Sequence, residues 1–248
     1  MNSYTMKPIA VAHTLFTQRF GIPRQPGLVP EAKGTLKFDK DPDFLHALKG
    51  IEQFSHLWIL FVFHEHGGNK WKPTIRPPRL GGKVKMGVLS SRSPHRPNPI
   101  GLSVVKIEKI NLQAKNGAEI EVSGIDLLDG TPVLDIKPYI PYADSVPDAN
   151  AGWAKEEIKK TPVHFEELAV QKIPTPEIKD LMEQLLTIDP RPGFQKREFP
   201  PEADLSQGKV FGLLVKEYDV KWKIEDQKFV VFDVEKLENG KKPKKKVK

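Results

Sequence analysis

The sequence contains no cysteine, and this absence removes several kinds of chemistry at once. Disulfide bonds, thiolate nucleophiles and cysteine-ligated zinc are all excluded. The nucleotide-binding signatures G-x-G-x-x-G and G-x-x-x-x-G-K-[ST] are also missing, and so is the G-x-S-x-G motif of many hydrolases. We therefore expect neither a doubly wound dinucleotide-binding fold nor a hydrolase of that type.

Long hydrophobic stretches are missing as well. The longest apolar run, residues 57–63, is far shorter than a bilayer-spanning helix. The first residues show no basic stretch leading into a long apolar core, as a signal peptide would. These absences predict a cytoplasmic protein without a membrane partner.

Positive charge is present in excess, and its placement matters more than its total. The net charge is +7, but residues 241–248 carry six lysines, which leaves +1 for the rest. We interpret this end as a disordered basic tail, either a phosphate-contacting arm or simply a solvated terminus. Residues 66–107 contain no acidic residue, and four of the eight arginines lie between positions 76 and 96. Such a segment suits RNA or an anionic ligand, unless acidic residues from elsewhere in the fold balance it.

Strand signals dominate the first half of the chain. The apolar run at residues 56–64 predicts a central strand that is covered on both faces. Residues 104–112 and 120–124 predict a hairpin, with Asn116 and Gly117 in its turn. A glycine within a strand, Gly124, indicates a bulge or a place where a ligand approaches the backbone.

The C-terminal part has a different pattern. Thr175-Pro176-Glu177 predicts a helix start with a capping hydroxyl, and apolar residues then recur at helical spacing until Asp189-Pro190. Residues 218–224 alternate as a half-buried strand does, with residues 229–234 as the expected hairpin partner. We therefore predict a mainly β protein with a β domain at 1–150, a small α+β domain at 151–240 and the basic tail at 241–248.

The segment SRSPHRPNPIGLS, residues 91–103, offers the densest set of functional groups. Arg92 and Arg96 could hold a carboxylate or phosphate, and prolines on both sides present the Asn98 amide with little freedom. A purely structural loop, in which Asn98 caps a turn, is the alternative. His64 and His66 share one face of a strand, but no carboxylate or cysteine at a suitable spacing accompanies them, so we expect a site rim and no metal.

Five segments in order, residues 23–29, 54–64, 76–82, 91–103 and 128–145, resemble the successive motifs of the TrmO family, also called YaeB or TsaA-like. Residues 189–196 and 220–222 resemble its bacterial branch. The resemblance implies a homodimeric β-barrel enzyme with its cofactor near the subunit interface. It also implies an S-adenosylmethionine-dependent methyltransferase that acts at position 37 in the tRNA anticodon loop, on an adenosine whose exocyclic nitrogen carries a threonylcarbamoyl group.

The resemblance further implies a cofactor pocket. The positions that match it are Gln25, Pro26, Gly27, His64, Glu65, Arg92, Leu102, Ser123, Gly124, Ile125 and Asp126. We expect Arg92 to pair with the cofactor's carboxylate and Gly124 to permit close backbone approach. Asp126 or Glu65 is expected to meet its ribose hydroxyls or amino group.

Roles in catalysis and RNA binding are hypotheses built on this match. The Asn98 side-chain oxygen is the first candidate to accept the proton of the acylated adenine nitrogen, and Asp135 is the alternative. Arg76, Arg79 and Arg96 are the candidate tRNA-backbone contacts, and Trp222 or Phe194 could add a contact from the C-terminal domain. A non-catalytic tRNA-binding or regulatory barrel, or a methyltransferase of another substrate, would carry the same motifs.

Overall fold

The structure, a computed structural model, describes residues 3–66 and 70–238. The chain divides into two compact units, one of residues 1–15 and 24–157 and the other of residues 16–23 and 158–248. Residues 16–23, which the sequence analysis assigned to the N-terminal domain, thus belong to the C-terminal unit. The tail predicted at 241–248 lies outside the described residues.

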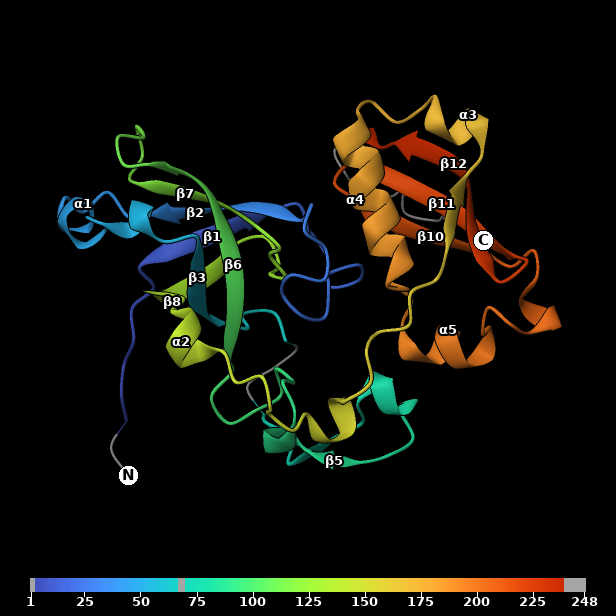
Figure 1. Cartoon of the computed structure of the whole chain (residues 1–248), viewed down its shortest axis with the longest axis horizontal. Coiled ribbons are helices and arrows are strands. Elements are labelled where there is room, and N and C mark those ends of the chain that lie inside the picture. The colour runs from blue at the N-terminus through green and yellow to red at the C-terminus, as the bar shows by residue number, and fades with distance from the viewer. Residues whose placement is uncertain (1–2, 67–69, 239–248) are drawn as a thin grey trace. The chain divides into compact units, whose positions relative to one another are not determined.

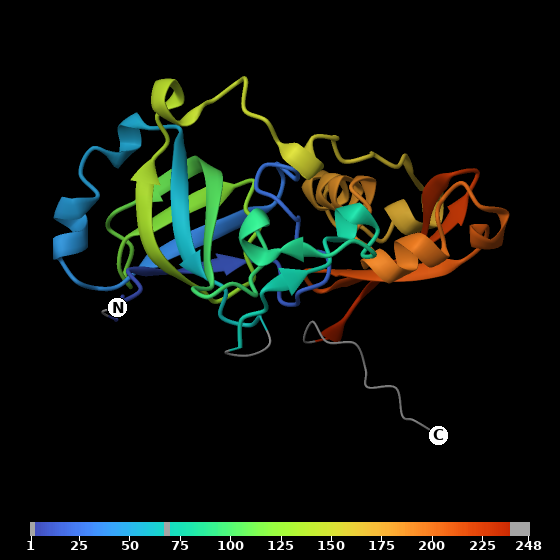
Figure 2. The same ribbon diagram turned by 90° about the horizontal axis from the view of Figure 1, so that it is seen from below.

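The first unit is built on a closed antiparallel barrel with the strand order β1-β2-β7-β6-β3-β8 (Figures 1 and 2). Its strands are β1 (Ala10–Thr14), β2 (Lys33–Phe38), β3 (His56–Val62), β6 (Ile100–Asn111), β7 (Glu119–Ser123) and β8 (Thr131–Pro138). Strand β1 closes the barrel by pairing with both β2 and β8. The side chains of Leu36, Ile59 and Ile120 are completely buried. The predicted β-barrel is therefore confirmed.

Strand β3 corrects one expectation. Its burial alternates, with Leu57, Ile59 and Phe61 buried and the residues between them only half-buried. A barrel strand has one interior face, so the predicted covering on both faces is wrong within this unit. The apolar side chains of Trp58 and Leu60 are left on the outer face.

The β6–β7 hairpin confirms the prediction for residues 104–124. Gly117 lies in its turn at φ 105°, and a Cβ there would be 2.3 Å from the Phe38 carbonyl oxygen, so only glycine fits. Between β3 and β6 the chain makes a long excursion in which two short strands, β4 and β5, pair (Figure 2). The shorter elements of this unit are α1 (Asp43–Ala47), η1 (Ile51–Gln53), β4 (Thr74–Ile75), η2 (Pro78–Leu80), β5 (Met86–Gly87), η3 (Val88–Ser90), α2 (Pro141–Asp144) and η4 (Gly152–Ala154).

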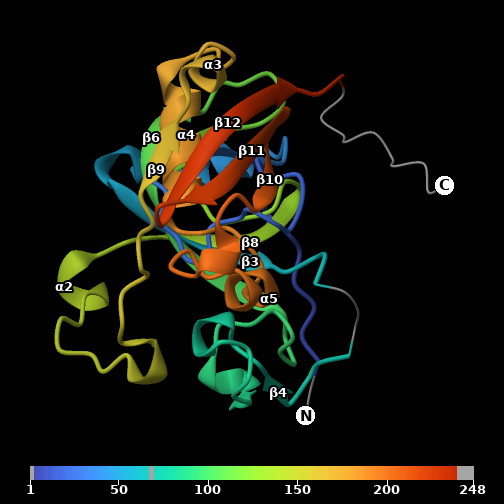
Figure 3. The ribbon, with the colours of Figure 1, turned by 90° about the vertical axis from the view of Figure 1, so that its right-hand side faces the viewer.

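The second unit is a four-stranded sheet with short helices, in the order β10-β11-β12-β9. Its elements are β9 (Val163–Phe165), α3 (Glu167–Val170), α4 (Pro176–Thr187), α5 (Gly193–Glu198), η5 (Asp204–Ser206), β10 (Val210–Val215), β11 (Tyr218–Glu225) and β12 (Lys228–Lys236). Helix α4 lies beside the sheet and buries Leu181, Met182, Leu185 and Leu186 (Figures 1 and 3). The predicted small α+β domain, its helix and its hairpin are thus confirmed. Among the described helices, none is long and apolar enough to cross a membrane.

Helix α4 begins where the sequence predicts, but not by the predicted cap. Thr175 has the extended backbone of an N-cap residue, yet its side chain makes no capping hydrogen bond. Pro176 at the first helical position fixes a helical φ by itself, and its missing N–H removes one of the groups that a cap would satisfy. The expectation of a capping hydroxyl is therefore wrong.

Candidate functional site

Two glycine backbones form the floor of the candidate site. Gly124 follows β7 at φ 71°, and the Gly27 N–H donates a 2.8 Å hydrogen bond to its carbonyl oxygen. A Cβ on Gly124 would lie 3.3 Å from the Gly27 Cα, in addition to the backbone strain of a side chain at this φ. The bare backbone at Gly124 therefore lets the loop of residues 24–29 come close.

A largely buried carboxylate lies two residues further along. The Ser103 hydroxyl, itself 1% exposed, donates a 2.6 Å hydrogen bond to Asp126 Oδ1. Burial raises the pKa of Asp126 to about 6, although the bond from Ser103, its own backbone N–H and the charge of Arg92 act in the opposite direction. At neutral pH this group is a carboxylate in a poorly solvated place, which a cationic ligand would stabilise.

The sequence analysis did not single out Ser103. Its signal was available, because residues 101, 103 and 105 of β6 form the buried face of that strand and only Ser103 among them has a polar side chain. A buried hydroxyl needs a partner, and Asp126 is that partner.

An arginine–glutamine pair adds charge to the same group of residues. Arg92 Nη1 donates a 2.5 Å hydrogen bond to Gln25 Oε1, and the Arg92 side chain is exposed to solvent. The structure therefore brings together Gln25, Gly27, Arg92, Gly124 and Asp126 from three separate segments of the chain. Pro26 lies between two of them in sequence.

The other residues of the expected pocket occupy different positions. His64 Nδ1 lies 3.5 Å from the hydroxyl of Thr131, the first residue of β8, which follows Asp126 in the chain. Glu65 is exposed. Ile125 is completely buried, so only its backbone is available to a ligand. Their roles stay predictions.

Two of these residues face away from Asp126. Ser123 directs its hydroxyl to Glu108 Oε1 at 2.6 Å, and this bond, with Lys106, lowers the pKa of Glu108. Leu102 is 51% exposed and pairs with Leu60 on the outer face of the barrel, the opposite side of β6 from Ser103.

Serine side chains order the loop that carries Arg96 and Asn98. Ser91 Oγ accepts from the Ser93 N–H at 3.2 Å, and Ser93 Oγ accepts from the His95 N–H at 3.3 Å. Arg96 Nη1 donates to the Ser91 carbonyl oxygen at 3.1 Å, so this arginine also stabilises the loop. Asn98 is exposed, and its backbone carbonyl accepts from the Ile100 N–H at 2.7 Å. The loop thus presents the Asn98 amide to solvent.

The alternative proton acceptor, Asp135, lies on β8 opposite Leu60 and pairs with Lys137 at 2.9 Å. Together with residues of the α1 region, Asp135 lines a cavity of about 520 Å³. Among the RNA-contact candidates, Arg76 is exposed, and Arg79 donates to the Glu156 carbonyl oxygen.

The two aromatic candidates of the C-terminal unit differ sharply. Phe194 is 57% exposed, whereas Trp222 is 2% exposed and packs against Phe211 and Phe229. The expectation that Trp222 could contact RNA is therefore wrong, because half-buried alternation in β11 places this side chain in the core. Among the described residues, no three histidine, aspartate or glutamate side chains cluster as a metal site would require.

The sequence comparisons cover both units. Residues 11–145 match the family model described as tRNA-methyltransferase O N-terminal domain, and residues 158–237 match the TrmO C-terminal domain. The chain belongs to the TrmO family. The TrmO fold is also found in a crystal structure of TrmO from Pseudomonas aeruginosa, with a TM-score of 0.72, 36% identity and coverage of 95% of this chain and 98% of that one.

Two curated relatives match over most of their length. The tRNA (adenine(37)-N6)-methyltransferase of Escherichia coli (strain K12) is 39% identical, covering 95% of this chain and 99% of the relative. A putative S-adenosylmethionine-dependent methyltransferase named RcsF, from Pseudomonas aeruginosa, is 42% identical, covering 89% and 92%.

Proposed function

We propose that this TrmO family protein is an S-adenosylmethionine-dependent tRNA (adenine37-N6)-methyltransferase. The observation that carries the proposal is the Asp126–Ser103 pair beside the Gly27–Gly124 backbone contact. A buried carboxylate next to a side-chain-free floor suits a ligand that has hydroxyls and positive charge together with a flat ring system. The names of the E. coli and P. aeruginosa relatives support this choice of ligand and reaction.

The residues of the site fit this cofactor group by group. Arg92, kept in place by Gln25, is suited to its carboxylate, since a guanidinium binds carboxylates through two parallel hydrogen bonds. Asp126 is suited to its ribose hydroxyls or ammonium group, which would offset the cost of the buried charge. S-adenosylmethionine, when bound, supplies an electrophilic methyl group, so the chain itself has to position the acceptor and remove a proton.

The acceptor in this proposal is the exocyclic nitrogen of adenosine 37 that carries a threonylcarbamoyl group. Acylation makes that nitrogen a weak nucleophile, and a hydrogen-bond acceptor at its N–H would compensate. The exposed Asn98 amide, held in an ordered loop between two prolines, takes this role in the proposal. Asp135 is the second candidate, although its ion pair with Lys137 competes for its oxygens.

The tRNA anticodon loop is proposed to bind over the basic excursion between β3 and β6. Arg76, Arg79 and Arg96 are the candidate phosphate contacts there, and a tRNA substrate places the reaction in the cytoplasm. Phosphate contacts release counterions, so tRNA affinity should fall steeply with rising salt. Replacing one phosphate-contacting arginine by alanine should reduce the slope of log affinity against log salt by about 1.

The proposal includes a homodimer formed through the outer face of β3 and β6. Trp58, Leu60 and Val104 lie there as cross-strand neighbours, and the 51% exposed Leu102 continues the apolar surface. Isolated exposed apolar residues need no explanation, but a contiguous group on one sheet face favours association.

A non-catalytic tRNA-binding module is the rival hypothesis, and cofactor uptake separates the two. The experiment combines calorimetry of the protein with S-adenosylmethionine and incubation with total tRNA and methyl-labelled cofactor, followed by nucleoside mass spectrometry. The proposal expects uptake of the cofactor and one methylated species, the N6-methyl threonylcarbamoyl adenosine. Binding of tRNA without cofactor uptake would refute the enzyme, and a different methylated nucleoside would refute the acceptor alone.

A further inference from the structure

An exposed tryptophan lies in the basic excursion and has no role in the proposal so far. Trp71 is 51% exposed and lies between Lys70 and Lys72, which are exposed as well. Tryptophan has a large apolar ring that normally packs inside or at an interface. An exposed indole between two cations is suited to bind a ligand that is both aromatic and anionic.

Backbone hydrogen bonds within the excursion hold the chain next to Trp71 near the loop of the candidate site. The Lys72 N–H donates a 2.9 Å hydrogen bond to the His95 carbonyl oxygen, and the Val88 N–H donates a 3.0 Å bond to the Pro73 carbonyl oxygen. Pairing of β4 with β5 follows directly. The backbone beside Trp71 is thereby held next to the loop that carries Arg96 and Asn98, so little backbone entropy is lost when the side chain engages a ligand.

The chain segment that contains Trp71 carries charge of one sign. Residues 66–107 contain no aspartate or glutamate. Burial is the largest cause that lowers the pKa of His95, and the charge of Lys72 and the neighbouring His66 act in the same direction. Such a surface attracts phosphate groups. The Trp71 indole is then available to contact the nucleobases of the same nucleotides.

We propose that Trp71 is a stacking platform for an unpaired nucleobase of the RNA substrate. The inference rests on the proposed function, since it takes tRNA as the ligand, and it adds a residue that no family match assigned. Proteins that recognise single-stranded RNA stack exposed bases on aromatic rings while cations neutralise the flanking phosphates. An indole face accepts any base, so Trp71 would hold the loop open without selecting its sequence.

The test compares Trp71→Ala, Trp71→Phe and Trp71→Leu with the unaltered protein. Binding of a fluorescein-labelled anticodon stem–loop RNA is measured by anisotropy at several salt concentrations, and a fully paired RNA duplex serves as the second ligand. Tyr142→Ala is the matched control, because Tyr142 is a 91% exposed aromatic outside the acid-free segment. Cofactor affinity and sedimentation mass are recorded for each variant.

Trp71→Ala should weaken stem–loop binding by roughly 5- to 150-fold, the range found for removal of a base-stacking aromatic. Trp71→Phe should recover most of the affinity and Trp71→Leu should not, because stacking needs a π face. The salt slope, duplex binding and cofactor affinity should not change, and Tyr142→Ala should behave like the unaltered protein.

Equal stem–loop affinity in Trp71→Ala and the unaltered protein would overturn the inference while leaving the enzyme proposal intact. Recovery by leucine as complete as by phenylalanine would overturn it too, as would a loss of affinity that accompanies a change in sedimentation mass, which would make Trp71 a protein contact. No binding of the stem–loop by the unaltered protein would refute RNA as the ligand and with it both proposals.

Discussion

At Asp126, the ionised carboxylate favours binding of the proposed ligand, whereas the protonated form favours the stability of the fold. Its pKa is raised from 3.8 to about 6, so the folded state binds the proton more tightly than the unfolded state does. The stability that comes from this proton is fully present below about pH 4 and is lost as the pH rises through about 6. A shift of about two units corresponds to about 3 kcal/mol.

Asp126→Asn should therefore stabilise the barrel unit above pH 6 by up to about 3 kcal/mol, because the amide keeps the bond from Ser103 without the buried charge. The same change should weaken cofactor binding. Urea unfolding at pH 5 and pH 8, with calorimetry at pH 8, measures both effects. Glu108→Gln is the control of opposite sign, since the pKa of Glu108 is lowered by Ser123 and Lys106. Equal stability of Asp126→Asn and the unaltered protein at pH 8 would contradict the argument.

Asn98 tests the proposed proton acceptor. Asn98→Ala should lower the methylation rate by about a hundredfold or more, the range for loss of a positioned acid–base group, with cofactor affinity unchanged because the proposal assigns this side chain to the RNA substrate and not to the cofactor. Single-turnover methylation of tRNA provides the measurement. Asp135→Asn is the matched variant and should retain most activity. Full activity of Asn98→Ala would remove its role, and a large loss in Asp135→Asn would transfer the role to that residue.

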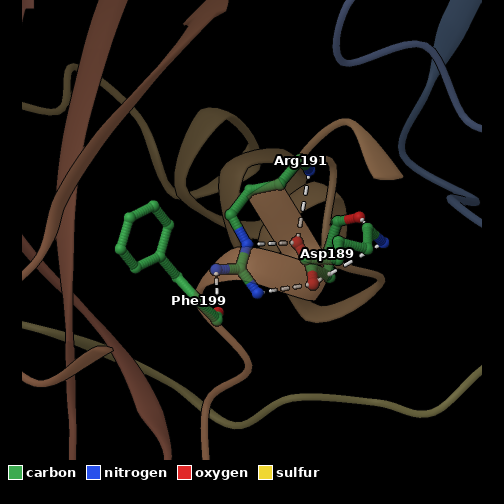
Figure 4. Close-up of polar contacts among 4 residues, drawn as sticks. Asp189, Arg191 and Phe199 are labelled. Carbon is green, nitrogen blue, oxygen red and sulfur yellow. Dashed lines mark hydrogen bonds and ion pairs between the residues drawn. The ribbon is translucent and has the colours of Figure 1, made fainter. Parts of the chain in front are cut away.

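At the scale of elements, the C-terminal unit depends on a buried ion pair just after α4. Asp189, at φ 51°, receives two bonds of 2.8 Å from Arg191, whose guanidinium also donates to the Phe199 carbonyl oxygen (Figure 4). The guanidinium lies 4.9 Å and 5.1 Å from the ring centroids of Phe211 and Phe229. Only a planar, multiply donating cation makes all of these contacts together.

Arg191→Met should therefore destabilise this unit by about 3–5 kcal/mol, because it leaves the carboxylate of Asp189 without its main partner. Arg191→Lys should recover only part of the loss. Trp222, the single tryptophan of the unit, packs on the same two phenylalanines and reports unfolding by its fluorescence. The double variant Asp189→Asn with Arg191→Met should be more stable than Arg191→Met alone. Additive losses in the double variant would show that the two residues do not act as a pair.

At this scale, the sequence could predict those features that depend on residues close to one another in the chain. The alternation at Ile120 and Val122, the turn at Gly117 and the apolar spacing of α4 were visible because each depends on neighbours in the chain. The contact of Gly27 with Gly124 and the bond of Ser103 to Asp126 were not, because barrel closure brings distant segments together. The position of Arg191 in the core was missed for the same reason, since its aromatic neighbours come from β10 and β12. Glycine at 124 did carry a local signal for a close approach to its backbone, and the structure places the Gly27 backbone there, whereas the approach of a ligand stays a prediction.

At the scale of the whole molecule, the apolar outer face of the barrel offers a position at which the proposed dimer can be tested by substitution. The sequence of β3 is apolar on both faces, yet the barrel buries only one, so Trp58 and Leu60 stay half-exposed beside Leu102. Burial of this outer face by a second copy of the chain would explain why β3 is apolar on both of its faces. Leu102→Glu places a carboxylate there, and burying it without a partner would cost several kcal/mol per subunit.

Sedimentation equilibrium should therefore find a dimer for the unaltered protein and a monomer for Leu102→Glu at micromolar concentration. Val11→Glu is the matched control, because Val11 is 36% exposed on the outer face of β1, and β8 separates that strand from the β3–β6 surface. It should stay dimeric, since its carboxylate would remain in water. A dimer that survives Leu102→Glu but not Val11→Glu would move the interface to the β1 side. A monomeric unaltered protein would mean that the apolar outer face serves something other than self-association.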